Sequence, residues 1–195
     1  MDEMEQARLV KEAKDGSLDA FNQLVAEYQT PVYNLAFRML IDAAGAEDVT
    51  QDTFLAAYRK LHTFHTGNFR AWLLRIASNS CRDHLRSPRV RRSVSLEALE
   101  ESPSFAVQDT GESPEAHVLR RELGYMIVET FLRLPVDQRL AVVLVSVLGY
   151  SYDEAAEIMR VPIGTVKSRL SRGRLTLRDL LKAQGELLPG EYRLG

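Results

Sequence analysis

The chain has 195 residues, room for one domain or two small ones, and a formal net charge of −2. This overall charge excludes a protein that binds polyanions with its entire surface. The single cysteine excludes an internal disulfide framework and a cysteine-based zinc site, and the four histidines show no metal-ligand spacing. We therefore expect no metal and no cofactor.

Charge is unevenly distributed along the chain. Residues 58–92 carry nine Lys or Arg against one Asp, and residues 160–182 carry seven against one. Residues 93–137, between them, carry three Lys or Arg against nine acids. Two basic segments indicate two contacts with a polyanion, because each cation placed on a phosphate releases counterions. Two solvated helix faces are the alternative explanation.

Two further absences bear on where the protein acts. The first residues are acidic and lack the apolar region of a signal peptide. The sequence also contains no stretch of about 18 apolar residues, which is the length needed to span a membrane. We expect a soluble cytoplasmic protein without membrane insertion.

Apolar residues at helical spacing dominate the first half of the chain. One stripe runs from Leu18 to Tyr28, and a second runs from Val32 to Leu40 after Pro31. Further helices are expected at about 44–61 and about 68–86, separated by a turn at 65–68. No alternating strand pattern occurs, so the sequence predicts an all-α fold.

Helical periodicity is lost from about Ser87 to Gly111, where Pro, Ser, Glu and Asp give the composition of a linker. Leu96 and Leu99 predict one short helical turn within it. Periodicity returns near Val118 and continues past Pro135, which breaks or restarts the helix. The sequence thus predicts two small helical domains joined by an acidic flexible linker, with a domain at 1–88, the linker at 89–125, a second domain at 126–184 and a tail at 185–195.

The segments 151–159 and 164–172 have the pattern of a helix-turn-helix. Val166 and Leu170 lie on one side of the second helix and would pack on Ala156 and its neighbours. Small hydroxyls and cations occupy the remaining sides, which suits base edges and phosphates in a major groove. An αα-hairpin that only packs is the structural alternative. The predicted DNA-binding residues are Thr165, Lys167, Ser168, Arg169, Ser171, Arg172 and Arg174.

A second constellation lies on the helix expected at about 68–86. Arg75, Asn79, Arg82 and Arg86, here called the basic stripe, share one face of this helix. Trp72 lies at the edge of that face, just after the loop 64–69. A cationic face bordered by aromatic rings is suited to single-stranded nucleic acid. The alternative is that Trp72 belongs to the core and the arginines form a solvated face.

The helix expected at about 44–61 carries polar and apolar residues together on one face. Asp48, Gln51, Asp52 and Leu55, here called the acidic patch, cluster on it. Carboxylates beside an exposed leucine suit a partner with basic residues, whereas a plain solvated face is the alternative. Acid–base or metal chemistry would also need a nucleophile, a cleft or further ligands, and none is evident.

Taken together, the segments 46–54, 69–79, Leu134-Pro135 and 164–170 resemble the extracytoplasmic-function (ECF) sigma factors of bacterial RNA polymerase, the minimal branch of the sigma-70 family. The resemblance covers roughly residues 17–182, with the motifs in the expected order. It implies a non-enzymatic subunit that directs core polymerase to promoters and assists their melting. Neither a cofactor nor a small-molecule substrate is implied.

The resemblance also implies roles for each part of the chain. The first domain would bind the polymerase beta-prime clamp and the promoter −10 element, and the second would bind the −35 element and the beta flap. The linker would enter the path that RNA later takes, and an anti-sigma factor would mask both domains. The implied clamp contacts are Asp48, Gln51, Asp52, Phe54 and Leu55. The implied −10 contacts, where a flipped base of the non-template strand would be held, are Phe64, Phe69, Trp72, Arg75, Asn79, Arg82 and Arg86.

Arg160 departs from the family pattern, since many relatives have glycine in this turn. A left-handed backbone there would cost arginine about 1 kcal/mol more than glycine, so either the turn avoids that conformation or the strain is tolerated.

Two other functions remain as alternatives to a sigma factor. A stand-alone helix-turn-helix regulator would bind a palindromic site as a dimer without polymerase, and a nucleic-acid enzyme would act on DNA through a carboxylate such as Asp52.

Overall fold

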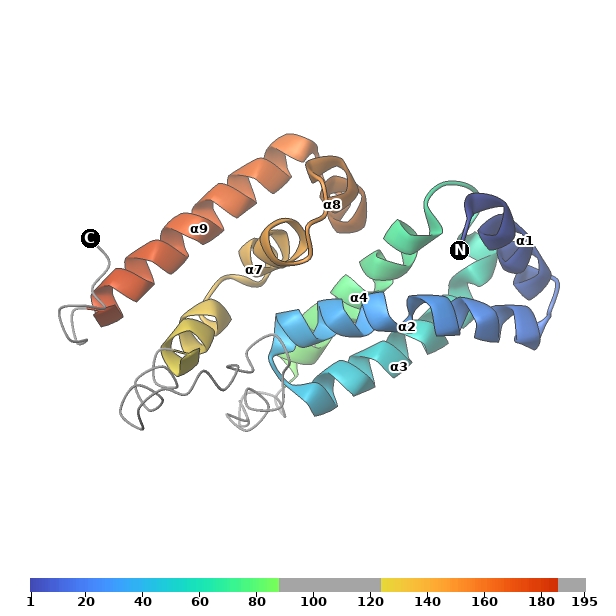
Figure 1. Cartoon of the computed structure of the whole chain (residues 1–195), viewed down its shortest axis with the longest axis horizontal. Helices are drawn as coiled ribbons and strands as arrows, with labels where there is room; N and C mark the ends of the chain where they lie inside the picture. Colours follow the sequence, from blue (N-terminus) through green and yellow to red (C-terminus); the bar gives the residue numbers. More distant parts are fainter. Residues whose placement is uncertain (88–123, 186–195) are drawn as a thin grey trace, which may run out of the picture.

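The computed structural model describes residues 1–87 and 124–185, and within these residues all regular structure is helical (Figure 1). The all-α fold in two helical parts is confirmed. The first part contains α1 (Glu3–Lys14), α2 (Leu18–Leu40), α3 (Ala43–Lys60), the 3-10 turn η1 (Leu61–Thr63) and α4 (Phe69–Arg86). The second contains a helical segment at 124–132, α7 (Val136–Val142), the π-helical turn η3 (Val143–Val147), α8 (Tyr152–Met159) and α9 (Ile163–Gly185).

Part of the predicted organisation lies outside the described residues. This applies to 88–123, which include most of the expected linker and the turn at Leu96 and Leu99, and to 186–195 in the expected tail.

Helix α1 was not among the expected elements. The Asp2 carboxylate accepts a hydrogen bond from the Glu5 amide and caps the helix. Leu9 and Ala13 are buried against α2, so an apolar stripe within a highly charged segment fixes this helix to the domain.

Helix α2 continues through Pro31, and the expected division at this residue is wrong. Proline lacks an N–H and crowds the preceding turn, at a cost of about 3 kcal/mol in a helix interior. The helix is buried on both sides of the proline, with Leu24, Val32 and Leu35 almost inaccessible to solvent. It packs against α1, α3 and α4, and this burial outweighs the local defect.

Helix α4 is the most amphipathic long helix of the first part. Asn68 caps it by accepting a hydrogen bond from the Ala71 amide, and Leu73, Leu74 and Ala77 are buried. Cys81 is also fully buried, and burial raises the pKa of its thiol to about 12. The helix therefore anchors one face in the core and leaves the opposite face for the basic stripe.

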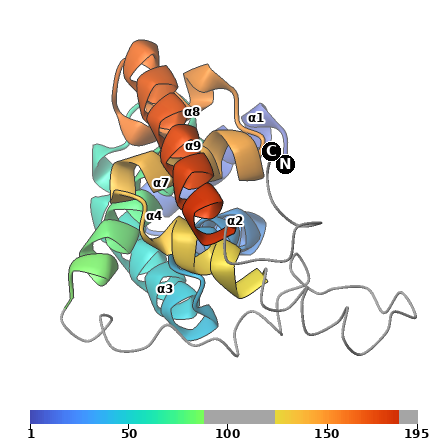
Figure 2. The same ribbon diagram turned by 90° about the vertical axis from the view of Figure 1, so that its left-hand side faces the viewer.

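The two parts pack against each other, with α8 lying on α4 (Figures 1 and 2). Ile41, which ends α2 with a left-handed backbone (φ 52°), is buried beside Val128 of the second part. Such a conformation costs an L-residue about 1–2 kcal/mol, offset here by apolar contact. Arg139 of α7, only 4% exposed, donates a hydrogen bond to the Met39 carbonyl of α2 (3.0 Å).

Candidate nucleic-acid and polymerase interfaces

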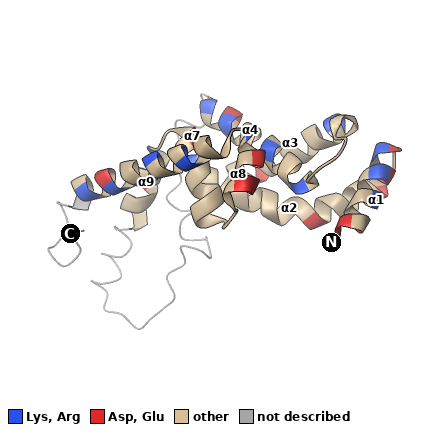
Figure 3. Cartoon of the chain, turned by 90° about the horizontal axis from the view of Figure 1, so that it is seen from above, with Lys and Arg blue, Asp and Glu red and all other residues tan. Residues whose placement is uncertain are grey.

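Helix α9 presents one side to its domain and the other to solvent. Val166 and Leu170 are buried against the domain, as expected. A β-carbon on Gly173 would lie 2.9 Å from a methyl group of Val142, so glycine allows α9 to approach α7 closely. Figure 3 shows the Lys and Arg residues along α9. Of the predicted DNA contacts, Lys167, Ser171, Arg172 and Arg174 are exposed, and Thr165, Ser168 and Arg169 are half-buried.

The helix preceding α9 is fixed at both ends. The Ser151 hydroxyl accepts from the Glu154 amide, and the Glu154 carboxylate accepts from the Ser151 amide (2.8 Å). Hydrogen bonding of this carboxylate to the Ser151 amide, and to the Ser151 side chain, lowers the pKa of the Glu154 carboxyl. At the other end Arg160 adopts the left-handed conformation (φ 56°), so the strain is tolerated rather than avoided. Ala155, not Ala156, is the fully buried alanine of this helix.

The loop before α4 is held by an aromatic cluster of Phe64, Phe69 and Trp72. Their ring centroids lie 5.3–5.5 Å apart, and all three residues are buried. Phe69, at 1% exposure, belongs to the core, while Phe64 and Trp72 also border a cavity of about 220 Å³. The sequence left open whether Trp72 is a core residue, and the structure places it between the core and this cavity.

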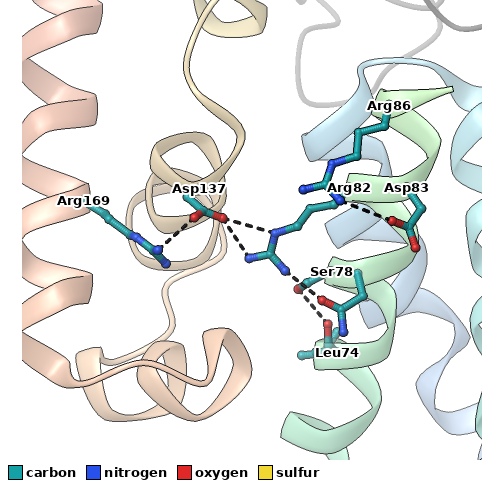
Figure 4. Close-up of polar contacts among 8 residues, drawn as sticks. Leu74, Ser78, Arg82, Asp83, Arg86, Asp137 and Arg169 are labelled. Atoms are coloured by element: carbon teal, nitrogen blue, oxygen red, sulfur yellow. Dashed lines mark hydrogen bonds and ion pairs between the residues drawn. The ribbon is translucent and has the colours of Figure 1, made fainter. Parts of the chain in front are cut away.

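The basic stripe reaches the same cavity at one end, and its members differ in their partners. Arg75 lines the cavity, which Glu157 of α8 also borders. The Arg82 guanidinium donates to the Asn79 side-chain oxygen (2.9 Å). It also donates to the Asp137 carboxylate (3.1 Å), as Figure 4 shows. Arg86, at the end of the stripe, is exposed and lies 3.9 Å from the Asp83 carboxylate.

Lys14 is a contact of this loop that the sequence did not indicate. Its ammonium group, at the end of α1, donates to the Phe64 carbonyl and lies 5.7 Å from the Phe64 ring centroid. The two residues are 50 positions apart, so periodicity could not connect them. Helix α1 thus reaches the loop that borders the cavity.

The acidic patch is solvent-exposed on α3. Asp48, Gln51 and Asp52 are exposed, and Leu55 is 49% exposed. Beside it, a largely apolar groove of about 670 Å³ opens between α2 and α3. Phe54, with only 9% of its surface exposed, lines this groove together with Gln51 and Leu55. The patch and the groove form one continuous surface of mixed polarity.

Among the described residues no group of His, Cys, Asp or Glu could hold a metal ion. No helix in the same residues is both long and apolar enough to span a membrane.

The chain matches two protein-family models in sequence. The model for sigma-70 region 2 matches residues 24–91, and that for sigma-70 region 4 matches residues 125–177. The RNA polymerase sigma-H factor of Pseudomonas aeruginosa is 37% identical, over 90% of this chain and 93% of its own length. The chain belongs to the ECF sigma factors of the sigma-70 family. It is therefore an RNA polymerase sigma factor, a non-enzymatic transcription initiation factor, and the stand-alone regulator is not favoured.

Further relatives and solved structures agree with this assignment. The ECF sigma factor SigW of Bacillus subtilis is 34% identical over 92% of this chain and 98% of its own length. The structure of CnrH in complex with the cytosolic domain of CnrY matches with a TM-score of 0.64 and 30% identity, covering 92% of this sigma factor and 98% of that chain. The sigma factor RpoE of Bartonella quintana, in complex with the anti-sigma factor NepR, matches with a TM-score of 0.56 and 30% identity, covering 85% and 98%.

Proposed function

We propose that this sigma factor divides promoter recognition between its two parts. Residues 1–88 bind core polymerase and the −10 element, residues 126–184 bind the −35 element, and residues 89–125 connect them. The family-model matches at 24–91 and 125–177 support these boundaries. The observation that carries the proposal is the pair of basic surfaces, on α4 and α9, each backed by a buried apolar face.

The −35 element is read by the solvent side of α9. Arg172 is exposed, opposite the buried Val166 and Leu170, and is free to reach a base edge. Lys167 and Arg174 flank it at positions suited to phosphates. Gly164, exposed at the start of the helix with no atom near its missing β-carbon, lets a DNA backbone approach closely.

Replacing Arg172 by alanine is expected to weaken −35 recognition by about 1–3 kcal/mol, because a bidentate contact to a base is lost. Binding of polymerase holoenzyme to a duplex with the −35 element should be measured against a duplex with that element scrambled. Arg133→Ala, at an exposed arginine that pairs with the nearby Glu129, is the control. An equal loss on both duplexes would mean that Arg172 contacts only phosphates.

The −10 element is held at the cavity beside the aromatic cluster. Phe64 and Trp72 supply ring surface at its border, and Arg75 supplies charge for the strand. Asn79 presents an amide that can hydrogen-bond a base edge once it is released from Arg82. Phe69 is buried in the core and acts indirectly, because it holds the loop beside the cavity in place.

Lys14→Ala is expected to weaken open-complex formation about two- to tenfold, because the Phe64 carbonyl loses its donor and the loop is held less firmly. Lys14→Arg should restore most of the loss, since its guanidinium can reach the same carbonyl. Permanganate reactivity of promoter thymines measures opening, and binding of holoenzyme to the −35 element should stay unchanged. A loss of −35 binding in Lys14→Ala would contradict this positioning role.

Core polymerase is bound through the acidic patch and the adjoining groove. Exposed Asp48 and Asp52 provide charge for a basic partner, while Leu55 and Phe54 provide apolar contact. The second part contacts the beta flap. An anti-sigma factor is a further partner, supported by the similar structure of the sigma factor RpoE in complex with the anti-sigma factor NepR. The proposed site of action is the cytoplasm, supported by the similarity to the ECF RNA polymerase sigma factor SigW.

The decisive experiment adds this protein to purified core polymerase and genomic DNA and maps the 5′ ends of the transcripts. We expect a small set of start sites that share −35 and −10 sequences and are absent without the protein. A gel shift without polymerase tests the alternative. Tight binding of the free protein to a palindromic site as a dimer, with no new start sites, would contradict the proposal.

A further inference from the structure

The two surfaces proposed to bind DNA lie against each other in this structure. Asp137, in the first turn of α7, is between them (Figure 4). One of its carboxylate oxygens accepts from Arg82 Nε and Nη2 of α4, at 3.2 and 3.1 Å. The other forms an ion pair with Arg169 Nη2 of α9, at an N–O distance of 2.8 Å. A single carboxylate thus joins one arginine of the proposed −10 surface to one of the proposed −35 surface.

Two further contacts cover the same face of the first part. The Arg70 guanidinium of α4 lies over the ring of Tyr150, which precedes α8, at 5.0 Å from the ring centroid. Glu157 of α8 borders the cavity beside Phe64 and Trp72. The second part therefore directs an aromatic ring and a carboxylate at the surface where unpaired bases and their phosphates would lie.

The groups that the second part places on this surface resemble those of a nucleic acid, because a carboxylate can stand in for a phosphate and an aromatic ring for a base. Arginine forms the same charge-assisted forks with carboxylates and with phosphates. The side chains of Arg82 and Arg169 are only 19% and 25% exposed, so neither is fully available to a second anion while Asp137 is in place. Arg82 also donates to Asn79 Oδ1, which occupies a group proposed to contact a base.

We propose that this arrangement is a closed state of the free sigma factor, in which the Asp137 carboxylate latches the two DNA-binding surfaces together and competes with promoter phosphates for Arg82 and Arg169. The inference rests on the two DNA-binding surfaces proposed above and on the DNA contacts that the sequence predicts for these two arginines. The latch is reversible, because Asp137 remains 45% exposed to water and salt. Promoter DNA, which offers phosphates to both arginines, is the chemical competitor that opens it.

The test compares the full-length wild-type chain with Asp137→Asn, in which the charge is lost and the shape kept. Cysteines introduced in place of the exposed Lys60 and Lys182 carry a donor and an acceptor dye, while the buried Cys81 stays unlabelled. Energy transfer between the two parts should fall in Asp137→Asn. Raising the salt concentration from about 0.05 to about 0.5 M should lower it in the wild type and change it little in the variant.

The second measurement is binding of the free protein to a single-stranded −10 oligonucleotide and to a −35 duplex. The apparent affinity scales with the fraction of open molecules, so Asp137→Asn should bind both about three- to tenfold more tightly. Asp153→Asn, which removes an exposed carboxylate from α8, controls for the loss of charge alone and should leave both affinities nearly unchanged.

The outcomes separate the latch from the DNA roles. If energy transfer in the wild type and in Asp137→Asn is the same at low salt, the latch is wrong while the DNA roles stand. If Asp137→Asn opens the molecule without tightening DNA binding, the competition between Asp137 and phosphates is wrong. If Arg82→Ala and Arg169→Ala bind both DNA molecules as tightly as Asp137→Asn does, the proposed DNA roles fail, although the measured opening remains.

Discussion

Replacing Asp48 and Asp52 together by lysine is expected to lower the affinity of this sigma factor for core RNA polymerase by at least about 30-fold. Both carboxylates are exposed on α3, one helical turn apart, and face a partner that we propose to be basic. Reversal puts like charges opposite each other, and such juxtaposition costs several kcal/mol, whereas about 2 kcal/mol already corresponds to 30-fold. Fluorescence anisotropy of the labelled sigma factor titrated with core enzyme measures the effect.

The fold should tolerate this change. Among the described residues neither carboxylate forms an ion pair, and lysine is a better helix former than aspartate. The double variant Glu5→Lys and Glu12→Lys on α1 changes the net charge by the same amount at a distant surface. If both double variants lose affinity equally, net charge rather than the acidic patch determines binding, and the docking assignment is wrong.

The second large effect is expected on stability. Arg139→Ala should lower the free energy of unfolding by about 3 kcal/mol or more, because three main-chain carbonyls lose their donor and a cavity is left. These carbonyls belong to Met39, Leu132 and Leu134. Burial lowers the pKa of Arg139 to about 10, so the side chain still carries its charge at neutral pH.

Urea unfolding followed by two probes tests this prediction. Trp72, the single tryptophan, reports on the first part, and far-UV circular dichroism reports on all helices. In Arg139→Ala the helical signal should begin to fall at lower urea than the tryptophan signal, because Leu132 and Leu134 lie in the second part. Arg139→Met, which refills the volume but supplies no donor, should recover only part of the loss.

Arg133→Ala is the matched control. This arginine is close in sequence to Arg139, but its side chain is 53% exposed and its ion pair with Glu129 lies at the surface, so its loss should cost less than about 1 kcal/mol. Equal midpoints for Arg139→Ala and Arg133→Ala would mean that the three hydrogen bonds contribute little to stability.

Strong local patterns allowed most of the helices to be predicted from the sequence. The spacing of Val166 and Leu170 predicted the buried side of α9, and Asn68 was expected at the start of α4, which it caps. The same reasoning failed where tertiary burial outweighs local preference, as at Pro31. The start of helix α1 could have been predicted, because Asp2 is a hydrogen-bond acceptor followed three residues later by Glu5, which is a typical helix-capping pattern.

Contacts between distant parts of the chain could not be predicted in this way. Arg82 and Asp137 are 55 residues apart, and no periodicity relates them. The basic stripe was correctly placed on one helix face, but its partner within the same molecule was not foreseen. Whether an aromatic residue at the edge of such a face points inward is likewise decided by packing, as for Phe69 and Trp72.

The burial of Cys81 has a consequence for oxidative chemistry. Oxidants attack the thiolate, and this thiol is inaccessible to solvent and has a pKa of about 12, so almost none of it ionises at neutral pH. Because it is the only cysteine of the chain, the folded protein has no other thiol that peroxide or a disulfide could modify. The thiol chemistry of this chain is therefore closed to oxidants as long as the protein stays folded.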